Sequence, residues 1–247
     1  MMDRVWKDGE GTFLQAWGIV PPDLSAPRED QAAAVFGKIE SILGSAGMTF
    51  ANVLRTWFYC DRINEWYGGF NAARTAFFGS VGIGSGRFPA STGIGFPNPF
   101  GAALVAGFVA KSPAGFVTVG SPLQEDAFSY GSSFSRAVET DTARGRVLFV
   151  SGTASILPGS GEVAFVGDPV RQMECAMSAA LAIVESRGMS ESDVSRMTVY
   201  LKSPEYAALW KAYSSAHPDL PRADVMIADV CRPEWLFEVE MDAVKRP

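Results

Sequence analysis

The last apolar segment of the chain carries an acidic side chain at every second position, at Glu238, Glu240 and Asp242. On a β-strand this spacing places all three carboxyl groups on one face. That face is either the solvated side of an edge strand or a set of groups that act on a substrate. A carboxyl group buried in a dry cleft has a raised pKa and can deliver a proton at neutral pH.

Other catalytic chemistries lack their residues. The single histidine, His217, precedes Pro218 at a predicted helix end, which argues against a histidine general base. The three cysteines, Cys60, Cys175 and Cys231, form no CxxC pair, so neither a disulfide framework nor a zinc site is expected. No GxGxxG or GxxxxGK[ST] motif is present. The sequence therefore predicts no cofactor and no metal.

Composition restricts the partners. The 247 residues are 47% hydrophobic and carry a formal net charge of −6. An acidic chain without a basic stripe does not favour a nucleic-acid partner. No apolar run reaches the ~18 residues of a membrane span, and the opening MMDRVWKDGEG lacks the apolar core of a signal peptide. We expect a soluble cytoplasmic protein with no membrane partner.

The chain repeats itself. Gly47-Met48, Val53, Arg55 and Tyr59 recur at a constant offset of 141 residues, as from Gly47 to Gly188. Such an offset over unlike residue types indicates two copies of one unit. We predict one unit over residues 1–112 and a second over 113–247, each close to a usual domain size.

Both copies have the same predicted order of elements. In the second copy, Asp168 caps a helix that has Pro169 at its first position, and Gly188 closes it. Apolar residues repeat every two positions in the predicted strands and every three to four positions in the predicted helices. These patterns give each unit the order β-β-α-β-α-β-β, an α+β layer with two helices on one face of a sheet. Predicted strands are 13–18, 55–60, 88–95, 103–110, 145–152, 194–201, 224–230 and 236–244; predicted helices are 31–43, 65–78, 168–187 and 204–215; the linker is 113–128.

The second copy resembles the Rid (YjgF-like) family, whose fold is chorismate-mutase-like and whose members form trimers. The segments that carry the resemblance are Phe134-Ser135-Arg136-Ala137, Leu148-Phe149-Val150-Ser151-Gly152, Gly167-Asp168-Pro169, Val199-Tyr200-Leu201-Lys202, Pro221-Arg222-Ala223 and Glu238-Val239-Glu240. The resemblance implies that Arg222 binds a substrate carboxylate and that Glu238 handles a proton or a water. The first copy has Ser91 roughly where the arginine would be and no carboxylate on its last strand, so we expect its surface to serve as a wall of the second copy's cleft.

Three further segments resemble the chorismatase family, two-domain enzymes of the same fold. They are Trp66-Tyr67-Gly68-Gly69-Phe70-Asn71-Ala72-Ala73-Arg74, Phe88-Pro89-Ala90-Ser91-Thr92-Gly93-Ile94-Gly95 and Asp229-Val230-Cys231-Arg232. Members cleave chorismate to pyruvate and a hydroxybenzoate or a dihydroxycyclohexadiene carboxylate. A cysteine near Cys231 is associated with the 3-hydroxybenzoate branch, so the resemblance favours that product; a small buried hydrophobe is the alternative for Cys231.

Chorismate is a dianion with an enolpyruvyl ether, so its cleavage needs a proton donor and cations. Glu238 is the candidate acid. The candidate groups for binding the substrate are Arg74, Arg136, Arg222, Arg232 and Lys202, with Tyr67 and Asn71 on the helix face of Arg74 and with Ser151 and Thr153 at a strand end. Arg74 and Arg136 could equally be exposed structural arginines, and Ser151 and Thr153 could simply close the strand.

Two other functions remain open. One is a Rid-type enamine or imine deaminase that uses Arg222 and Glu238, and the other is a non-catalytic module that binds small carboxylates. A monomer and a homotrimer are both compatible with the sequence.

Overall fold

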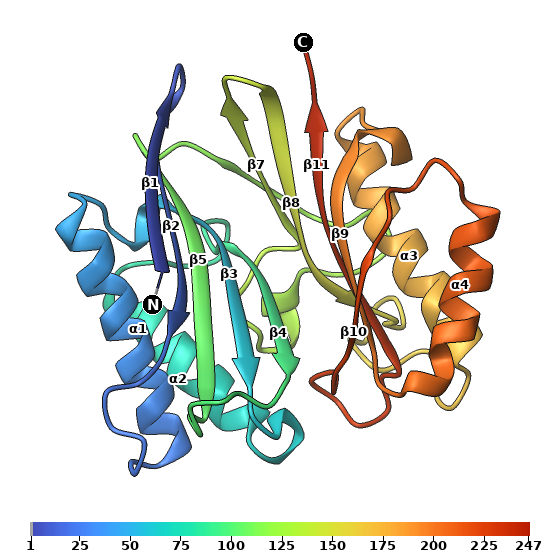
Figure 1. The fold of residues 1–247 in the computed structure, drawn as a ribbon, viewed down its shortest axis with the longest axis horizontal. Helices are drawn as coiled ribbons and strands as arrows, with labels where there is room; N and C mark the ends of the chain where they lie inside the picture. Colours follow the sequence, from blue (N-terminus) through green and yellow to red (C-terminus); the bar gives the residue numbers. More distant parts are fainter. Residues whose placement is uncertain (1) are drawn as a thin grey trace.

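The computed structural model describes residues 2–247 and has two β-sheets that pack face to face with helices outside (Figure 1). Helices α1 and α2 cover the outer face of one sheet, and α3 and α4 cover the outer face of the other. Within these residues, no helix combines the length and apolar character needed to cross a bilayer.

The first sheet has the strand order β1-β2-β5-β3-β4, in which only the β3–β4 pair is parallel. Its elements are β1 (Met2–Asp8), β2 (Gly11–Ile19), α1 (Arg28–Ser45), β3 (Val53–Cys60), α2 (Tyr67–Ser80), β4 (Ala90–Gly95) and β5 (Leu104–Ser112).

The second sheet has the order β10-β9-β11-β8-β7-β6, with β9 and β10 parallel. Its elements are β6 (Val117–Val119), β7 (Ala137–Thr142), β8 (Gly145–Ala154), α3 (Pro169–Ser186), β9 (Val194–Leu201), α4 (Ala207–Ala216), β10 (Asp224–Ile227) and β11 (Phe237–Lys245). The predicted α+β class is confirmed, and both units contain the predicted β-β-α-β-α-β-β order, which β6 precedes in the second unit.

The repeated residues form the same connection twice. Gly47 and Gly188 follow α1 and α3 with φ of 68° and 67°, a left-handed conformation that ends a helix and favours glycine. Thr49 and Ser190 then open equivalent 3₁₀ turns, each with a capping box. This helix-to-strand connection sets where β3 and β9 begin, and hence where their side chains point.

Most predicted boundaries shift by one to three residues, and for two segments the structure shows the reason. The stretch expected to be only a linker contains β6, because Val117–Val119 pairs with β7 and extends the edge of the second sheet. The strand predicted over 224–230 ends at Ile227, because the chain then crosses to the first sheet. There Asp229 and Gly95 exchange both backbone hydrogen bonds, at 2.6 and 3.0 Å.

Gly95 is required at this crossing. A Cβ atom on residue 95 would lie 2.6 Å from Asp229 Cβ and 2.7 Å from Ile63 Cγ2, closer than side chains can approach. A second backbone contact, from Ser135 N to Pro89 O at 3.1 Å, joins the other end of β4 to the segment before β7. Both ends of β4 are thus bonded to the second unit, whereas most of β10, its counterpart, is exposed.

Candidate active site

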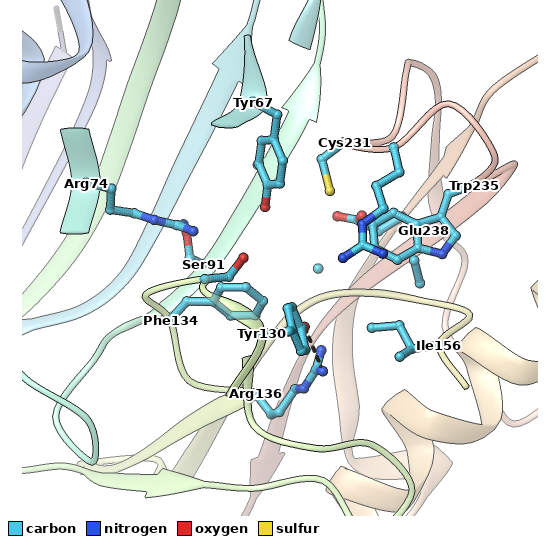
Figure 2. Close-up of a pocket in the computed structure, with 15 residues that line it drawn as sticks. Tyr67, Arg74, Ser91, Tyr130, Phe134, Arg136, Ile156, Cys231, Trp235 and Glu238 are labelled. Atoms are coloured by element: carbon cyan, nitrogen blue, oxygen red, sulfur yellow. Dashed lines mark hydrogen bonds between the residues drawn. The ribbon is translucent and has the colours of Figure 1, made fainter. Parts of the chain in front are cut away.

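A narrow cavity of about 40 Å³ lies between the two units (Figure 2). The first unit supplies residues from α2 and β4, and the second supplies β8, β11 and the loops around them. The lining residues are Tyr67, Arg74, Ser91 and Gly93 from the first unit and Tyr130, Ser132, Phe134, Arg136, Gly152, Ala154, Ile156, Cys231, Arg232, Trp235 and Glu238 from the second.

Glu238 is the acidic group of this cavity. Strand β11 runs between β8 and β9, with Glu238 opposite Ala154 on one side and Tyr200 on the other. The side chain is 4% exposed and has no hydrogen-bond or ion-pair partner among residues 2–247. Burial, reinforced by the charge of Glu240 and opposed by that of Arg136, raises the pKa of Glu238 to about 8. At neutral pH most of this carboxyl group is therefore protonated.

The absence of a side chain at Gly152 leaves room for the Glu238 carboxyl group. A Cβ atom on residue 152 would collide with Glu238 Oε1 and approach Thr92 Cγ2 to 3.2 Å. The backbone of β8 can therefore lie against the carboxyl only because residue 152 has no side chain.

Glu240, two positions further along β11, has the opposite environment. Arg55 Nη2 lies 2.7 Å and Arg196 Nη2 lies 2.9 Å from its carboxylate oxygens. Thr92 Oγ1 and Trp57 Nε1 donate two more hydrogen bonds, at 2.5 and 3.0 Å. Burial by itself raises the pKa of Glu240, but the two arginines and these donors outweigh it and hold the pKa below its ordinary value. Glu240 is ionised.

Two buried guanidinium groups in the cavity have no carboxylate partner among the residues described. Arg74 is 2% exposed, hydrogen-bonds Asn71 Oδ1 and lies over the rings of Phe70 and Phe134. Arg136 is 1% exposed and donates only to neutral oxygens, Glu125 O at 2.7 Å and Tyr130 Oη at 2.8 Å. A buried cation is costly unless it meets an anion. Both groups therefore point to an anionic ligand.

A third cation, Arg232, lies at the same cavity. It is partly exposed, donates to Gly161 O at 2.9 Å and stands over the ring of Trp235. It also has no acidic partner among residues 2–247.

Tyr67 and Cys231 face each other across the cavity, one from each unit (Figure 2). Burial raises the pKa of the Tyr67 hydroxyl above its usual range and, with the charge of Glu238, raises the pKa of the Cys231 thiol to about 12. The thiol is therefore neutral and is no nucleophile at physiological pH.

The remaining predicted residues lie outside the cavity lining. Asn71 accepts a hydrogen bond from Arg74 and so orients it. The Ser151 hydroxyl donates to Ser135 O and accepts from Ser91 N, while the Thr153 hydroxyl donates to Ser151 O. Lys202 donates to Pro233 O and lies 3.6 Å from Asp229. Ser151 and Thr153 are fully buried and hold strand and loop backbone in place.

The structure does not bring Arg222 and Glu238 together. Arg222 lines a separate groove with Trp210, Lys211 and Val225, between α4 and β10. The reason is that the cavity lies between units, so Glu238 of the second unit meets β4 of the first. Ser91, at the predicted arginine position of the first copy, is the residue that lines the cavity.

Some residues of the site carried no signal in the sequence. Tyr130, on a short 3₁₀ helix, and Trp235, on a loop, line the cavity but look like ordinary apolar residues. Arg55 and Arg196, which bind Glu240 outside the lining, looked like parts of the repeated framework. Only the tertiary pairing of the two sheets reveals their place.

Fold and site together define a two-unit α+β protein with an acid and, within residues 2–247, arginines without carboxylate partners between its units. Residues 125–245 match the family model "Endoribonuclease L-PSP". A crystal structure of a chorismatase is similar over 97% of this chain and 76% of that chain, with a TM-score of 0.79 and 22% identity. The chain thus has the two-domain, Rid-like fold of a chorismatase, and the predicted resemblance is confirmed at that level.

Rid proteins match about half of the chain. The YjgF gene product of E. coli is 22% identical over 52% of this chain and 98% of that chain, with a TM-score of 0.41. E. coli TdcF with bound serine is 21% identical over the same shares, with a TM-score of 0.41. A search of curated protein sequences gave no match.

Proposed function

We propose that this chain is a chorismatase, which cleaves the enolpyruvyl ether of chorismate and releases pyruvate. The observation that carries the proposal is the pairing, in one cavity, of a protonated carboxyl group with two buried guanidinium groups that have no carboxylate partner. Chorismate carries two carboxylates and needs one proton. The fold, shared with a chorismatase structure, supports the same assignment.

In the proposed reaction, Arg74 and Arg136 bind the two carboxylates and Glu238 transfers its proton to the methylene carbon of the enol ether. The ether carbon becomes an oxocarbenium centre. Capture by water adds one H₂O and gives pyruvate and a dihydroxycyclohexadiene carboxylate. Capture by the neighbouring ring hydroxyl needs no added water and forms a cyclic ketal. The bond between that oxygen and the ring then breaks, so the oxygen leaves as the ketone oxygen of pyruvate, and loss of a ring proton gives 3-hydroxybenzoate. In either case the proton returns to Glu238 when pyruvate leaves.

The surroundings of Glu238 favour this role. An acid must hold its proton at working pH, and burial in a cavity walled by Ala154, Ile156 and Trp235 supplies that condition. The cavity is narrow, so a six-membered ring enters when side chains at its mouth move. Arg232, on the loop before β11, is the most exposed of the three arginines that line the cavity.

Incubation of the purified protein with chorismate tests the proposal, with pyruvate measured by a coupled dehydrogenase assay and the ring product by chromatography. Glu238→Gln should lower the rate by about 10²–10⁴-fold, because the amide cannot act as the acid. Glu234→Gln, on the exposed loop, is the matched control and should keep full activity. Folded wild-type protein that releases no pyruvate would refute the proposal.

The Endoribonuclease L-PSP match over residues 125–245 favours a second candidate, a Rid-type enamine or imine deaminase. Ammonia release from a small 2-iminocarboxylate, with no pyruvate from chorismate, would support it. Binding of chorismate by calorimetry without any turnover would instead indicate a carboxylate-binding module.

A further inference from the structure

The two glutamates of β11 share a face but not their partners. Glu238 and Glu240 are two positions apart, a separation of about 7 Å along a strand. The donors at this place all bind Glu240: one arginine from each unit, a threonine hydroxyl and an indole N–H. Among residues 2–247, none binds Glu238.

This division decides which carboxyl group is charged. Two carboxyl groups at this distance in a buried setting do not both ionise unless cations neutralise each of them. The cations are committed to Glu240, where they approach to 2.7 and 2.9 Å. The charge therefore sits on Glu240, and the neighbouring group keeps its proton.

We infer that Glu240 is a positioning residue for Glu238: its fixed negative charge, held by Arg55 and Arg196, keeps the proton on the Glu238 carboxyl. Glu240 is not among the residues that line the cavity. The kinetic test rests on the proposed function, whereas a spectroscopic test does not.

The other ionisable groups around the pair are few. Arg136, Arg74 and Arg232 are the cations that face the Glu238 cavity, from the segment before β7, from α2 and from the loop before β11. Tyr67, Tyr130, Tyr200 and Cys231 are neutral, since the pKa of each is raised above its ordinary value. Around Glu240 the further groups are Tyr59 on β3 and Asp242 on its own strand.

Three variants separate this role from a structural one. In Glu240→Gln the alkaline limb of the pH profile of kcat/KM should move to lower pH by about one to two units. The substitution removes a negative charge about 7 Å from Glu238, which at an effective dielectric of about 20 lowers the pKa of Glu238 by that amount. In Arg196→Gln, which removes a cation that is 37% exposed, the limb should move to higher pH. Asp242→Asn, two positions further away, should move the limb in the same direction by about half as much, because the charge it removes is about twice as distant.

A merely structural role would lower activity in all three variants without shifting the limb, and that result would overturn the inference. If Glu240→Gln does not fold, Arg196→Gln decides, because an unmoved or lowered limb in that variant contradicts the proposal.

Infrared spectroscopy gives a readout that needs no substrate. The carbonyl band of the protonated Glu238 carboxyl is identified by its absence in Glu238→Gln, and its loss is followed as pH rises. The band should titrate at lower pH in Glu240→Gln than in the wild type. If the wild type does not cleave chorismate but the band shifts in this way, the proposed function fails and the inference about Glu240 stands. If the wild type cleaves chorismate but the band does not shift, the proposed function stands and the inference fails.

Discussion

Arg55 and Arg196 occupy equivalent positions of the two repeats and bind the same two carboxylates. Arg55 lies 2.7 Å from Glu240 and 3.0 Å from Asp242, and Arg196 lies 2.9 and 2.7 Å from the same residues. Two residues that the sequence shows only as repeated thus meet at one point between the sheets. The repeat is the source of the charge network, and both acids of the network belong to the second copy.

Glu238 should make the stability of the protein depend on pH. The pKa is about 8 in the folded state against 4.5 ordinarily, so between these values the native state binds more protons than the unfolded state. The free energy of unfolding therefore falls as pH rises through this window. Glu238→Gln removes the dependence and should be more stable than wild type at pH 8.5 by a few kcal/mol, on the order of one per unit of pKa shift.

Urea unfolding at pH 4.5 and at pH 8.5 measures this difference. Near pH 4.5 the wild type and Glu238→Gln should be almost equal in stability. At this pH the Glu238 carboxyl is protonated in the folded state, and about half of it is protonated in the unfolded state. An equal gap at both pH values would contradict a buried, protonated Glu238.

Arg74 and Arg55 are both buried arginines, but in the part of the chain that the structure describes only Arg55 has carboxylate partners. Arg74→Met should keep the fold at least as stable, because it removes an unpaired buried cation, yet weaken chorismate binding by about 2–5 kcal/mol. Arg55→Met should destabilise the fold by about 3–5 kcal/mol, because Glu240 and Asp242 lose a cation. Thermal unfolding and calorimetric binding separate the two, and a large loss of stability in Arg74→Met would speak against its role in binding.

Gly152→Ala should damage activity more than stability. The new methyl group displaces the Glu238 carboxyl, which is the movable end of a side chain, so the fold survives while the acid is misplaced. We expect a rate at least tenfold lower, in line with the sensitivity of catalysis to small displacements. Gly37→Ala, where nothing lies within 4 Å of an added Cβ, is the control and should leave activity intact. Wild-type rates for Gly152→Ala would contradict the close approach of β8 to Glu238.

Cys231→Ala should change the product and not the release of pyruvate. The thiol is neutral and lines the cavity opposite Tyr67, so in the proposed reaction it would shape the space in which the oxocarbenium centre is captured. Chromatography of the ring product should show a changed ratio of 3-hydroxybenzoate to dihydroxycyclohexadiene carboxylate, with total pyruvate similar. Loss of pyruvate in a folded variant would instead assign Cys231 a part in the cleavage step.

The sequence predicted the order of elements well, because each element has its own local signal. Asp168 caps α3 and accepts a hydrogen bond from Arg171 N, as its place before Pro169 implies. Gly47 and Gly188 close their helices for the same local reason. The offset of 141 residues then linked Gly47, Val53 and Tyr59 of the first copy to Gly188, Val194 and Tyr200 of the second.

The composition of the site was less accessible, because it depends on contacts between distant segments. The sequence led us to expect a wall from the first copy, and Tyr67, Arg74 and Ser91 do line the cavity of Glu238. It also placed Arg222 beside Glu238, whereas Arg222 lies in a separate groove. No local pattern states which edge strand meets which sheet. The end of β10 at Ile227 was not predictable for the same reason, because it depends on the backbone hydrogen bonds between Asp229 and Gly95, which join the two units.

The cavity is divided between two units that one peptide chain connects, and this has a consequence for concentration. A site shared between separate subunits is lost on dilution below their dissociation constant. Here the two walls stay at a fixed, high local concentration whatever the amount of protein present. Each molecule should therefore turn over substrate at the same rate in a nanomolar as in a micromolar solution.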